Sequence, residues 1–143
     1  MSCISVHKKA EAFLNQAISD LEAAKRSMRC NDCVLLAQQA AEKALKALLL
    51  KCCRKLIRIH ELTDLIKNIR KCGLRVPEYM KLAARELEPH YEASRYPDVT
   101  TYFFQCVECQ VAYDTYTPEI SEYCIDQAEK IVRWVVNEIK SLR

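Results

Sequence analysis

The chain has very little glycine: Gly73 is the only one among 143 residues. All-β folds and glycine-rich phosphate loops need several glycines, because their tight turns require positive φ or a close approach of the backbone to a ligand. Most nucleotide-binding fingerprints are therefore excluded. The longest apolar run, Cys33 to Ala37, is far shorter than a membrane span, and the N-terminus shows no basic-then-apolar signal segment. We expect a cytoplasmic protein with no membrane segment.

The length fits one domain, and the apolar half of the composition is enough for one sizeable core, so we expect a single domain over residues 1–143. The net charge of +3 is unevenly distributed. Residues 1–75 hold 15 Lys and Arg against 7 Asp and Glu, whereas residues 76–143 hold 7 against 12. The densest basic stretches, Lys51–Arg58 and Lys67–Arg75, suit RNA, a nucleotide or an acidic partner, or they form solvated helix faces that pair with the acidic half of the chain.

Cysteine is abundant, with nine residues. Two CxxC pairs, at residues 30–33 and 106–109, are formally a four-cysteine zinc pattern, but their wide separation and the lack of flanking glycines argue against it, so no metal ion is expected. Disulfides are an alternative, since they are common in proteins of hyperthermophilic archaea and bacteria. A third interpretation is that Cys52, Cys53 and Cys124 are buried as small apolar side chains.

Apolar residues recur every three or four positions along most of the chain, which is the spacing of amphipathic helices. We expect helices over residues 5–29, from Asn31 to about Cys52, from His60 to Cys72, from Pro77 to Leu87, and from Thr117 to the C-terminus. The last begins with Thr-Pro-Glu, which supplies a hydroxyl cap, a first-turn proline and an early acid. Residues 99–116 resemble a strand without a partner, and we expect an ordered loop or helical turn there. Its aromatic residues 102–104 should pack against the bundle or a second subunit.

Helices joined by short loops bury their apolar faces best as a bundle. We therefore expect an all-α, antiparallel up-and-down bundle of four to five helices. Val132, Trp134 and Val136 lie beside the main apolar stripe of the last helix, which indicates more apolar surface than one bundle covers. A homodimer is the expected way to cover that surface.

The segment Glu88–Asp98 is the richest in chemically useful groups, and two prolines interrupt it. Proline favours extended backbone in the residue before it, so Tyr96 should leave the helical path. Tyr91 and Arg95 would then project from an irregular loop that can bind a planar or anionic ligand. The alternative is architectural: Arg95 pairs with a neighbouring carboxylate, and Tyr96 buries its ring.

Four motifs follow one another along nearly the whole chain. They are Gln39-Ala-Ala-Glu-Lys-Ala-Leu-Lys-Ala-Leu48, His60-Glu-Leu62, Tyr91 followed by Ser94-Arg-Tyr-Pro-Asp98, and Ala128-Glu-Lys-Ile131 near Trp134. In this order they resemble the HEPN family (higher eukaryotes and prokaryotes nucleotide-binding domain). The resemblance implies a helical bundle, usually dimeric, that binds nucleotides or nucleic acid and is often encoded beside a minimal nucleotidyltransferase. Some members look like ribonucleases of toxin–antitoxin or defence systems.

The ribonuclease branch carries an arginine followed by a histidine after four to six residues, in which arginine holds a phosphate and histidine moves the proton of the attacking 2′-hydroxyl. Arg85 and His90 match with four residues between them, and Arg54 and His60 match with five. Neither pair opens the last helix, where the nucleases tend to place theirs. The first pair is the better candidate, since it adjoins Tyr91.

Together these observations predict a nucleotide- or RNA-binding module that acts with a nucleotidyltransferase in a toxin–antitoxin-like pair, without a cofactor. The residues expected to contact phosphate are Tyr91, Arg95, Tyr96, Lys43, Arg58 and His60, and the expected catalytic residues, if the protein cleaves RNA, are Arg85 and His90. Two alternatives stay open: a metal-independent endoribonuclease, and a scaffold without a ligand. Two of these residues have a structural alternative. His60 could cap the backbone or pack at the start of a helix, and Lys43 could form a surface pair with Gln39 four residues away.

Overall fold

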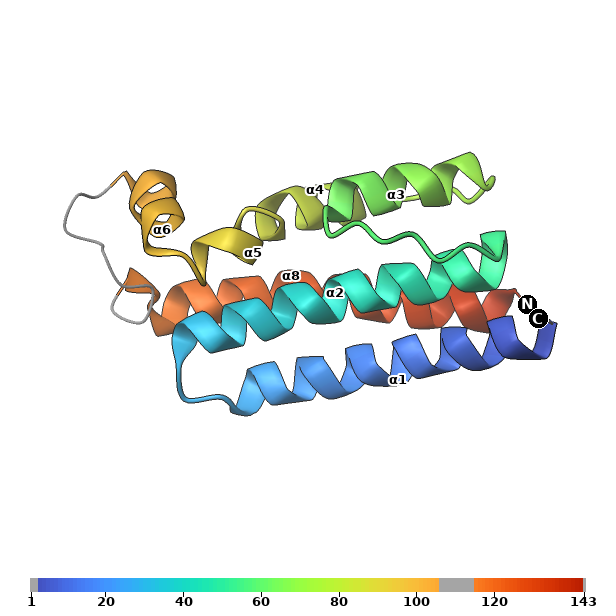
Figure 1. Cartoon of the computed structure of the whole chain (residues 1–143), viewed down its shortest axis with the longest axis horizontal. Coiled ribbons are helices and arrows are strands. Elements are labelled where there is room, and N and C mark those ends of the chain that lie inside the picture. Colours follow the sequence, from blue (N-terminus) through green and yellow to red (C-terminus); the bar gives the residue numbers. More distant parts are fainter. Residues whose placement is uncertain (1–2, 106–114, 143) are drawn as a thin grey trace.

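Three long helices form the frame of the molecule. The computed structural model describes residues 3–105 and 115–142, and its long helices are α1 (Cys3–Arg26), α2 (Cys30–Cys53) and α8 (Pro118–Ser141). Helix α2 packs against both of the others. Figure 1 shows α1 running opposite to α2 and α8 running beside α2 in the same direction as α2, so that both termini lie at the same end.

Helix α2 is the centre of the core, as its sequence predicts. Leu45, Leu48 and Leu49 are fully buried, and so are the alanines on the same helix. Alanine favours the helix intrinsically, and its small side chain lets neighbouring helices approach closely. The buried residues of α1, α3, α4 and α8 join those of α2 in one large apolar cluster.

Two shorter helices, α3 (Leu62–Lys71) and α4 (Glu78–Leu87), form an antiparallel hairpin on the other side of α2 from α1 (Figure 1). Helix α3 ends where the sequence predicts: the amides of Cys72 and Gly73 donate to carbonyls of the last turn, and Gly73 has φ +95, a conformation that glycine adopts without strain. The expected inward faces of both helices are buried.

The start of α2 and the segment after α4 differ from the prediction. Asn31 lies inside the first turn of α2 instead of capping it, and its Nδ2 donates to the carbonyl of Ser94 at 3.4 Å. The expected irregular loop is partly helical, with α5 (His90–Ala93) and α6 (Pro97–Phe104). Helix α5 follows Pro89, and α6 begins with Pro97. A helix start tolerates proline because the N–H that proline lacks has no partner within the helix there. Tyr96 lies outside the helices, as predicted.

Helix α6 also differs from the ordered loop or helical turn expected over residues 99–116. Residues 106–114 of that segment lie outside the described part. Tyr102 is 84% exposed, while Phe104 packs against the core. The structure confirms the all-α class, since residues 3–105 and 115–142 contain no strand, and the two short helices are additional to the expected four to five. Within those residues, no helix combines the length and apolar character needed to cross a bilayer.

Helix α8 begins as predicted, with Thr117 Oγ1 accepting from the Ile120 amide at 3.3 Å and Pro118 in the first turn. Trp134 and Val132 are buried within the chain, because α1 and α4 also pack against α8. The argument that these side chains leave apolar surface for a second subunit was therefore wrong. A homodimer itself stays a prediction.

A disulfide joins Cys53 to Cys72, with Cα atoms 5.9 Å apart, and so connects the end of α2 to the end of α3. The interpretation of Cys53 as a small apolar residue was wrong, and the disulfide alternative holds for this pair. Cys124 is buried, as expected, and burial raises the pKa of its thiol to about 12, with the Glu86 charge adding to the shift. Of the two CxxC pairs, the one at residues 106–109 lies outside the described residues.

Candidate functional site

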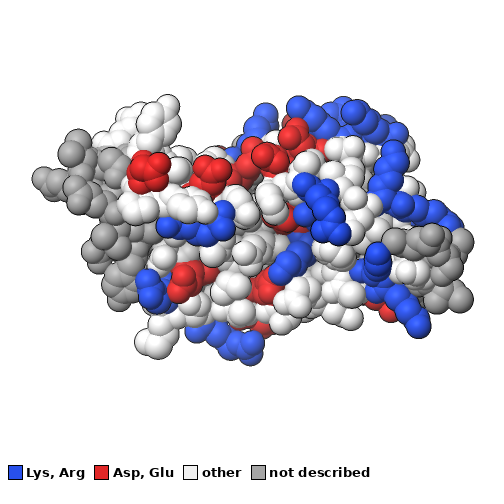
Figure 2. All heavy atoms as spheres, viewed as in Figure 1, with Lys and Arg blue, Asp and Glu red and all other residues white. Residues whose placement is uncertain are grey.

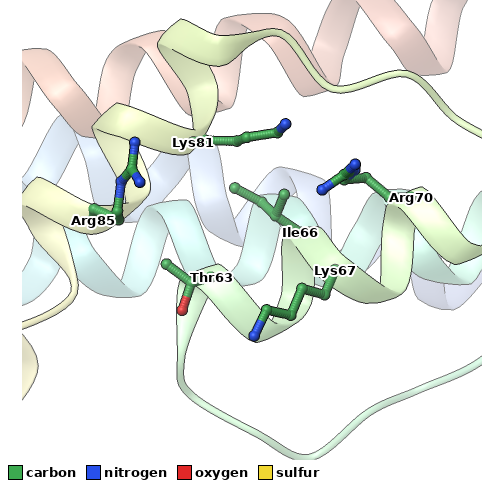
Figure 3. A pocket seen from close by; sticks show the side chains of 6 residues that line it. All are labelled: Thr63, Ile66, Lys67, Arg70, Lys81 and Arg85. Atoms are coloured by element: carbon green, nitrogen blue, oxygen red, sulfur yellow. The ribbon is translucent and has the colours of Figure 1, made fainter.

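Helices α3 and α4 present basic side chains to one another across a pocket of about 200 Å³. It is lined by Thr63, Ile66, Lys67 and Arg70 from α3 and by Lys81 and Arg85 from α4. Figure 3 shows Lys81 and Arg70 reaching toward one another, with Ile66 beside them. The spacing of the two cations on α4, four residues apart, places both on one helical face.

A second pocket, of about 620 Å³, continues the first one, because Lys67, Arg70 and Lys81 line both. Lys71 and Arg75 extend the basic lining toward the α3–α4 turn. Figure 2 shows Lys and Arg gathered over the part of the molecule that α3 and this turn occupy in Figure 1. We call the two pockets together the basic groove.

Most of the positive charge in the basic groove is not neutralised. Lys81 Nζ donates to Glu78 at 3.0 Å, which lowers the pKa of that carboxyl, and Lys67 lies 3.7 Å from Asp64 in an exposed pair. Such exposed pairs screen a charge only weakly. Across residues 3–105 and 115–142, the guanidinium groups of Arg70 and Arg85 have neither a hydrogen-bond nor an ion-pair partner. The groove can therefore attract an anion.

A contact between α4 and the start of α3 bounds the basic groove. Glu88 Oε1 accepts from the backbone N–H of Thr63 at 2.9 Å and from its hydroxyl at 2.8 Å. The carboxylate satisfies an otherwise unpaired amide of the first turn of α3 and complements the positive end of the helix dipole. Glu88 also lines a third pocket, so the groove and this pocket lie on either side of the contact.

The third pocket, of about 400 Å³, is aromatic and acidic. Its lining consists of His60, Glu61, Glu88, Pro89, Tyr91, Glu92, Val99, Tyr102 and Phe103. We call it the acidic aromatic pocket. Two of the predicted phosphate-binding residues, His60 and Tyr91, lie here, but three carboxylates in the same lining oppose a phosphate. The charge of this pocket favours neutral or cationic groups instead.

Arg95 is held by its own chain. Its Nε donates to the carbonyl of Tyr91 at 3.0 Å, and its Cζ lies 4.2 Å from the Tyr91 ring centroid and 5.1 Å from that of Tyr96. The alternative that Arg95 fixes the local structure is thus supported, although aromatic rings and a carbonyl take the place of the expected carboxylate. Both Arg95 and Tyr96 are exposed, so the alternative that Tyr96 buries its ring was wrong.

His60 connects this stack to the core. Its ring is stacked on Tyr91, with centroids 5.0 Å apart and an interplanar angle of 14°. Its Nδ1 lies 3.0 Å from Oε2 of Glu42, which also accepts from Lys46 Nζ at 2.8 Å. Glu42 and Lys46 are both 8% exposed. A buried ion pair on α2 therefore orients His60, and His60 in turn supports Tyr91.

The other predicted phosphate ligands lie elsewhere. Lys43 forms an ion pair with Asp20 of α1, so it connects two helices rather than pairing with Gln39 at the surface. Arg58 is exposed in the connection between α2 and α3 and lines neither the basic groove nor the acidic aromatic pocket. Phosphate binding by Lys43 and Arg58 stays a prediction.

The structure separates Arg85 from His90. Arg85 lines the basic groove, whereas the ring of His90 is buried, 2.7 Å from Tyr116 Oη and edge-on to Phe103. Burial lowers the pKa of His90 to about 4. A catalytic role for the pair stays a prediction, and a neutral imidazole of such low basicity is poorly suited to accept the proton of a hydroxyl near neutral pH.

The buried imidazole makes stability depend on pH. Because the folded state holds the pKa of His90 at about 4, below the ordinary value of about 6.5, protons bind the unfolded chain first as the pH falls. Lowering the pH from 7 to 4 should therefore reduce the free energy of unfolding by about 3 kcal/mol through His90 alone. Above pH 7, His90 causes no such loss. Urea unfolding of wild type and His90→Gln at both pH values measures this difference. The exposed His7→Gln serves as the control, and equal pH dependence in all three proteins would contradict the expectation.

Part of the basic groove can be predicted from the sequence. Lys67–Arg75 stands out as a basic stretch and Arg85 as a catalytic candidate whose guanidinium would hold a phosphate, but nothing in the sequence connects the two. Lys81 was missed altogether. The available signal was its spacing of four residues from Arg85 on one face of a helix opposite that stretch.

Comparisons with known proteins agree with this architecture. The profile of the HEPN domain matches residues 8–139. TT1696 from Thermus thermophilus is 32% identical in sequence, and its crystal structure superposes with a TM-score of 0.78 over 90% of this chain and 97% of that chain. ST0689, described as an archaeal HEPN homologue, is 27% identical, with a TM-score of 0.71 over 92% of this chain and 98% of that one. A search of curated proteins found no significant match. The chain belongs to the HEPN domain family.

Proposed function

We propose that this protein binds the phosphates of RNA or of a nucleotide in the basic groove, and that it is a binding module rather than a catalyst. One observation carries the proposal: Arg70 and Arg85, from two different helices, face a common groove and have no ion-pair partner among the described residues. Arginine is suited to this role, since its planar guanidinium binds phosphate oxygens in pairs. Membership of the HEPN family supports the proposal.

The shape of the groove favours a strand of RNA over a free nucleotide. The pocket between α3 and α4 has a volume of about 200 Å³, and the lining continues along α3 to Arg75. Pockets that enclose a whole small molecule are typically larger than about 300 Å³, so the first pocket suits a single phosphate group, and the second, of about 620 Å³, leaves room for the nucleic-acid chain to continue beyond it. A row of cations beside apolar groups such as Ile66 suits a sugar-phosphate backbone that passes along the surface.

A nucleotidyltransferase partner, a homodimer and a toxin–antitoxin-like pairing belong to the same proposal. Exposed aromatic side chains support a contact with another protein: Tyr102, which lines the acidic aromatic pocket, is 84% exposed, and Tyr96 is 49% exposed. Light scattering of the purified chain, alone and mixed with the product of an adjacent nucleotidyltransferase gene, tests both associations. A monomer that never co-elutes with that product would remove this part of the proposal.

Salt dependence of RNA binding tests the basic groove. If four of its cations contact phosphates, the logarithm of the binding constant for a single-stranded oligonucleotide should fall with log salt at a slope of about −3, because each contact releases condensed counterions. Removing two contacts in Arg70→Ala/Arg85→Ala should make the slope shallower by about 1.4. Fluorescence anisotropy at several salt concentrations gives both slopes.

Arg26→Ala is the matched control, since Arg26 is exposed at the end of α1, away from the groove (Figure 1). Its slope should equal that of wild type. A wild-type slope near zero, or an unchanged slope in the double variant, would contradict the proposal. The RNA should be recovered intact after incubation in EDTA, and cleavage by wild type would instead support the endoribonuclease alternative.

A further inference from the structure

Three cysteine sulfurs lie together where α2 and α3 end. The Sγ atoms of Cys52 and Cys53 are 3.4 Å apart, and those of Cys52, Cys53 and Cys72 all lie within 4.8 Å of one another. The sequence gives no hint of this group, since Cys72 is 19 residues from Cys53 and the three show no zinc-type spacing. The path of residues 54–71 brings Cys72 back to the end of α2.

Among the described residues Cys52 has no disulfide partner, so a third sulfur lies beside the disulfide. One chemistry open to a third sulfur is exchange, in which a thiolate attacks the Cys53–Cys72 disulfide. Metal coordination is the other chemistry open to three converging sulfurs. Tetrahedral zinc with bonds of about 2.3 Å holds its sulfur ligands about 3.8 Å apart. The Cys52 and Cys53 sulfurs already lie near that separation, and the Cys72 sulfur would move away from Cys53 once their disulfide is reduced.

The surroundings suit a negatively charged metal–thiolate group. Three thiolates around a divalent ion carry a net charge of −1, and Lys51, Arg54 and Lys71 flank the cysteines in the chain. Cys72 is exposed, so an ion can enter from solvent, and a fourth position is left for water or another ligand. Lys71 and Gly73, on either side of Cys72, both line the basic groove.

We propose that the reduced protein binds one thiophilic divalent metal ion, of the zinc class, through Cys52, Cys53 and Cys72. The disulfide is first reduced by a thiol reductant. The bond between the two sulfurs breaks, each sulfur gains one electron and one proton, and two thiols of the reductant become a disulfide. The metal ion then displaces the thiol protons to solvent. In either state the end of α2 stays cross-linked to the end of α3, by the disulfide or by the metal.

Titration of the full-length protein with Cd²⁺ tests this site. Protein reduced with a phosphine and freed of metal should show sulfur-to-metal charge-transfer absorption that saturates at one ion per chain at these cysteines, and Zn²⁺ should compete. Cys52→Ser is the decisive variant, because it leaves the Cys53–Cys72 pair intact. It should weaken Cd²⁺ binding at least about 100-fold. Cys72→Ser should do the same when it is compared with wild type in the reduced state, in which both proteins lack the disulfide.

Two controls separate this site from other cysteines and from the redox state. Cys30→Ser, at the opposite end of α2 (Figure 1), should bind Cd²⁺ like wild type. Oxidised wild type, with the disulfide verified by mass, should not bind at this site. Unchanged affinity in both Cys52→Ser and Cys72→Ser, absence of the charge-transfer band in reduced wild type, or equal binding by oxidised and reduced protein would each overturn the proposal.

Discussion

Replacing Arg70 and Arg85 together by glutamate should weaken binding of single-stranded RNA by about 100-fold or more. Each substitution removes an attraction to phosphate and adds a repulsion of similar size. Both side chains line the groove between α3 and α4, and neither has an ion-pair partner in the described part of the chain, so the folded state loses little. Fluorescence anisotropy with a labelled oligonucleotide at fixed salt measures the affinity, and circular dichroism confirms the fold.

The matched control changes the net charge equally but elsewhere. Lys9 and Arg26 are exposed on α1, on the far side of α2 from the groove (Figure 1). Lys9→Glu/Arg26→Glu should bind RNA within a few-fold of wild type, because screening limits the reach of an exposed charge to about 10 Å at ordinary salt. Equal loss in the two double variants would show that total charge, and not the basic groove, governs binding.

Glu42→Ala should destabilise the fold by about 3–5 kcal/mol. The substitution leaves the charge of Lys46 buried without its partner, and it removes the carboxylate that holds His60. Both members of the ion pair lie on α2, in the centre of the core, so the chain cannot expose Lys46 without disturbing its packing. Urea unfolding followed by circular dichroism gives the change in free energy.

Glu78→Ala is the comparison for an exposed pair. Glu78 accepts a hydrogen bond from Lys81 at the surface of α4, and its loss should have little measurable effect on the fold. If Glu42→Ala and Glu78→Ala destabilise the fold equally little, the buried ion pair on α2 contributes no more to stability than the exposed pair on α4, which contradicts the prediction.

The sequence was sufficient to predict most of the fold because helical periodicity is a local property. The stripe from Val34 to Leu48 predicts α2, and the Thr117 cap with Pro118 predicts the start of α8. Short elements were harder. Residues 99–104 belong to the stretch 99–116 with strand-like composition, yet they lie in helix α6, where packing of Phe104 against the core outweighs a weak intrinsic preference.

The site was less predictable because its chemistry depends on contacts between distant residues. Nothing near His90 in the sequence shows that Tyr116, 26 residues later, will bury it and lower its pKa. The basic groove likewise exists only once α4 lies against α3 and brings Lys81 beside Arg70. Arg95 looks available in the sequence, but only the fold shows that the Tyr91 ring and carbonyl hold it.

Mapping the RNA contact by amide chemical shifts in the ¹⁵N-labelled protein tests the central claim most directly. With a short single-stranded oligonucleotide, the largest shifts should fall on α3 and α4, around Lys67, Arg70, Lys81 and Arg85. Shifts concentrated instead around the acidic aromatic pocket, at Tyr91 and Tyr102, with α3 and α4 unchanged, would contradict it.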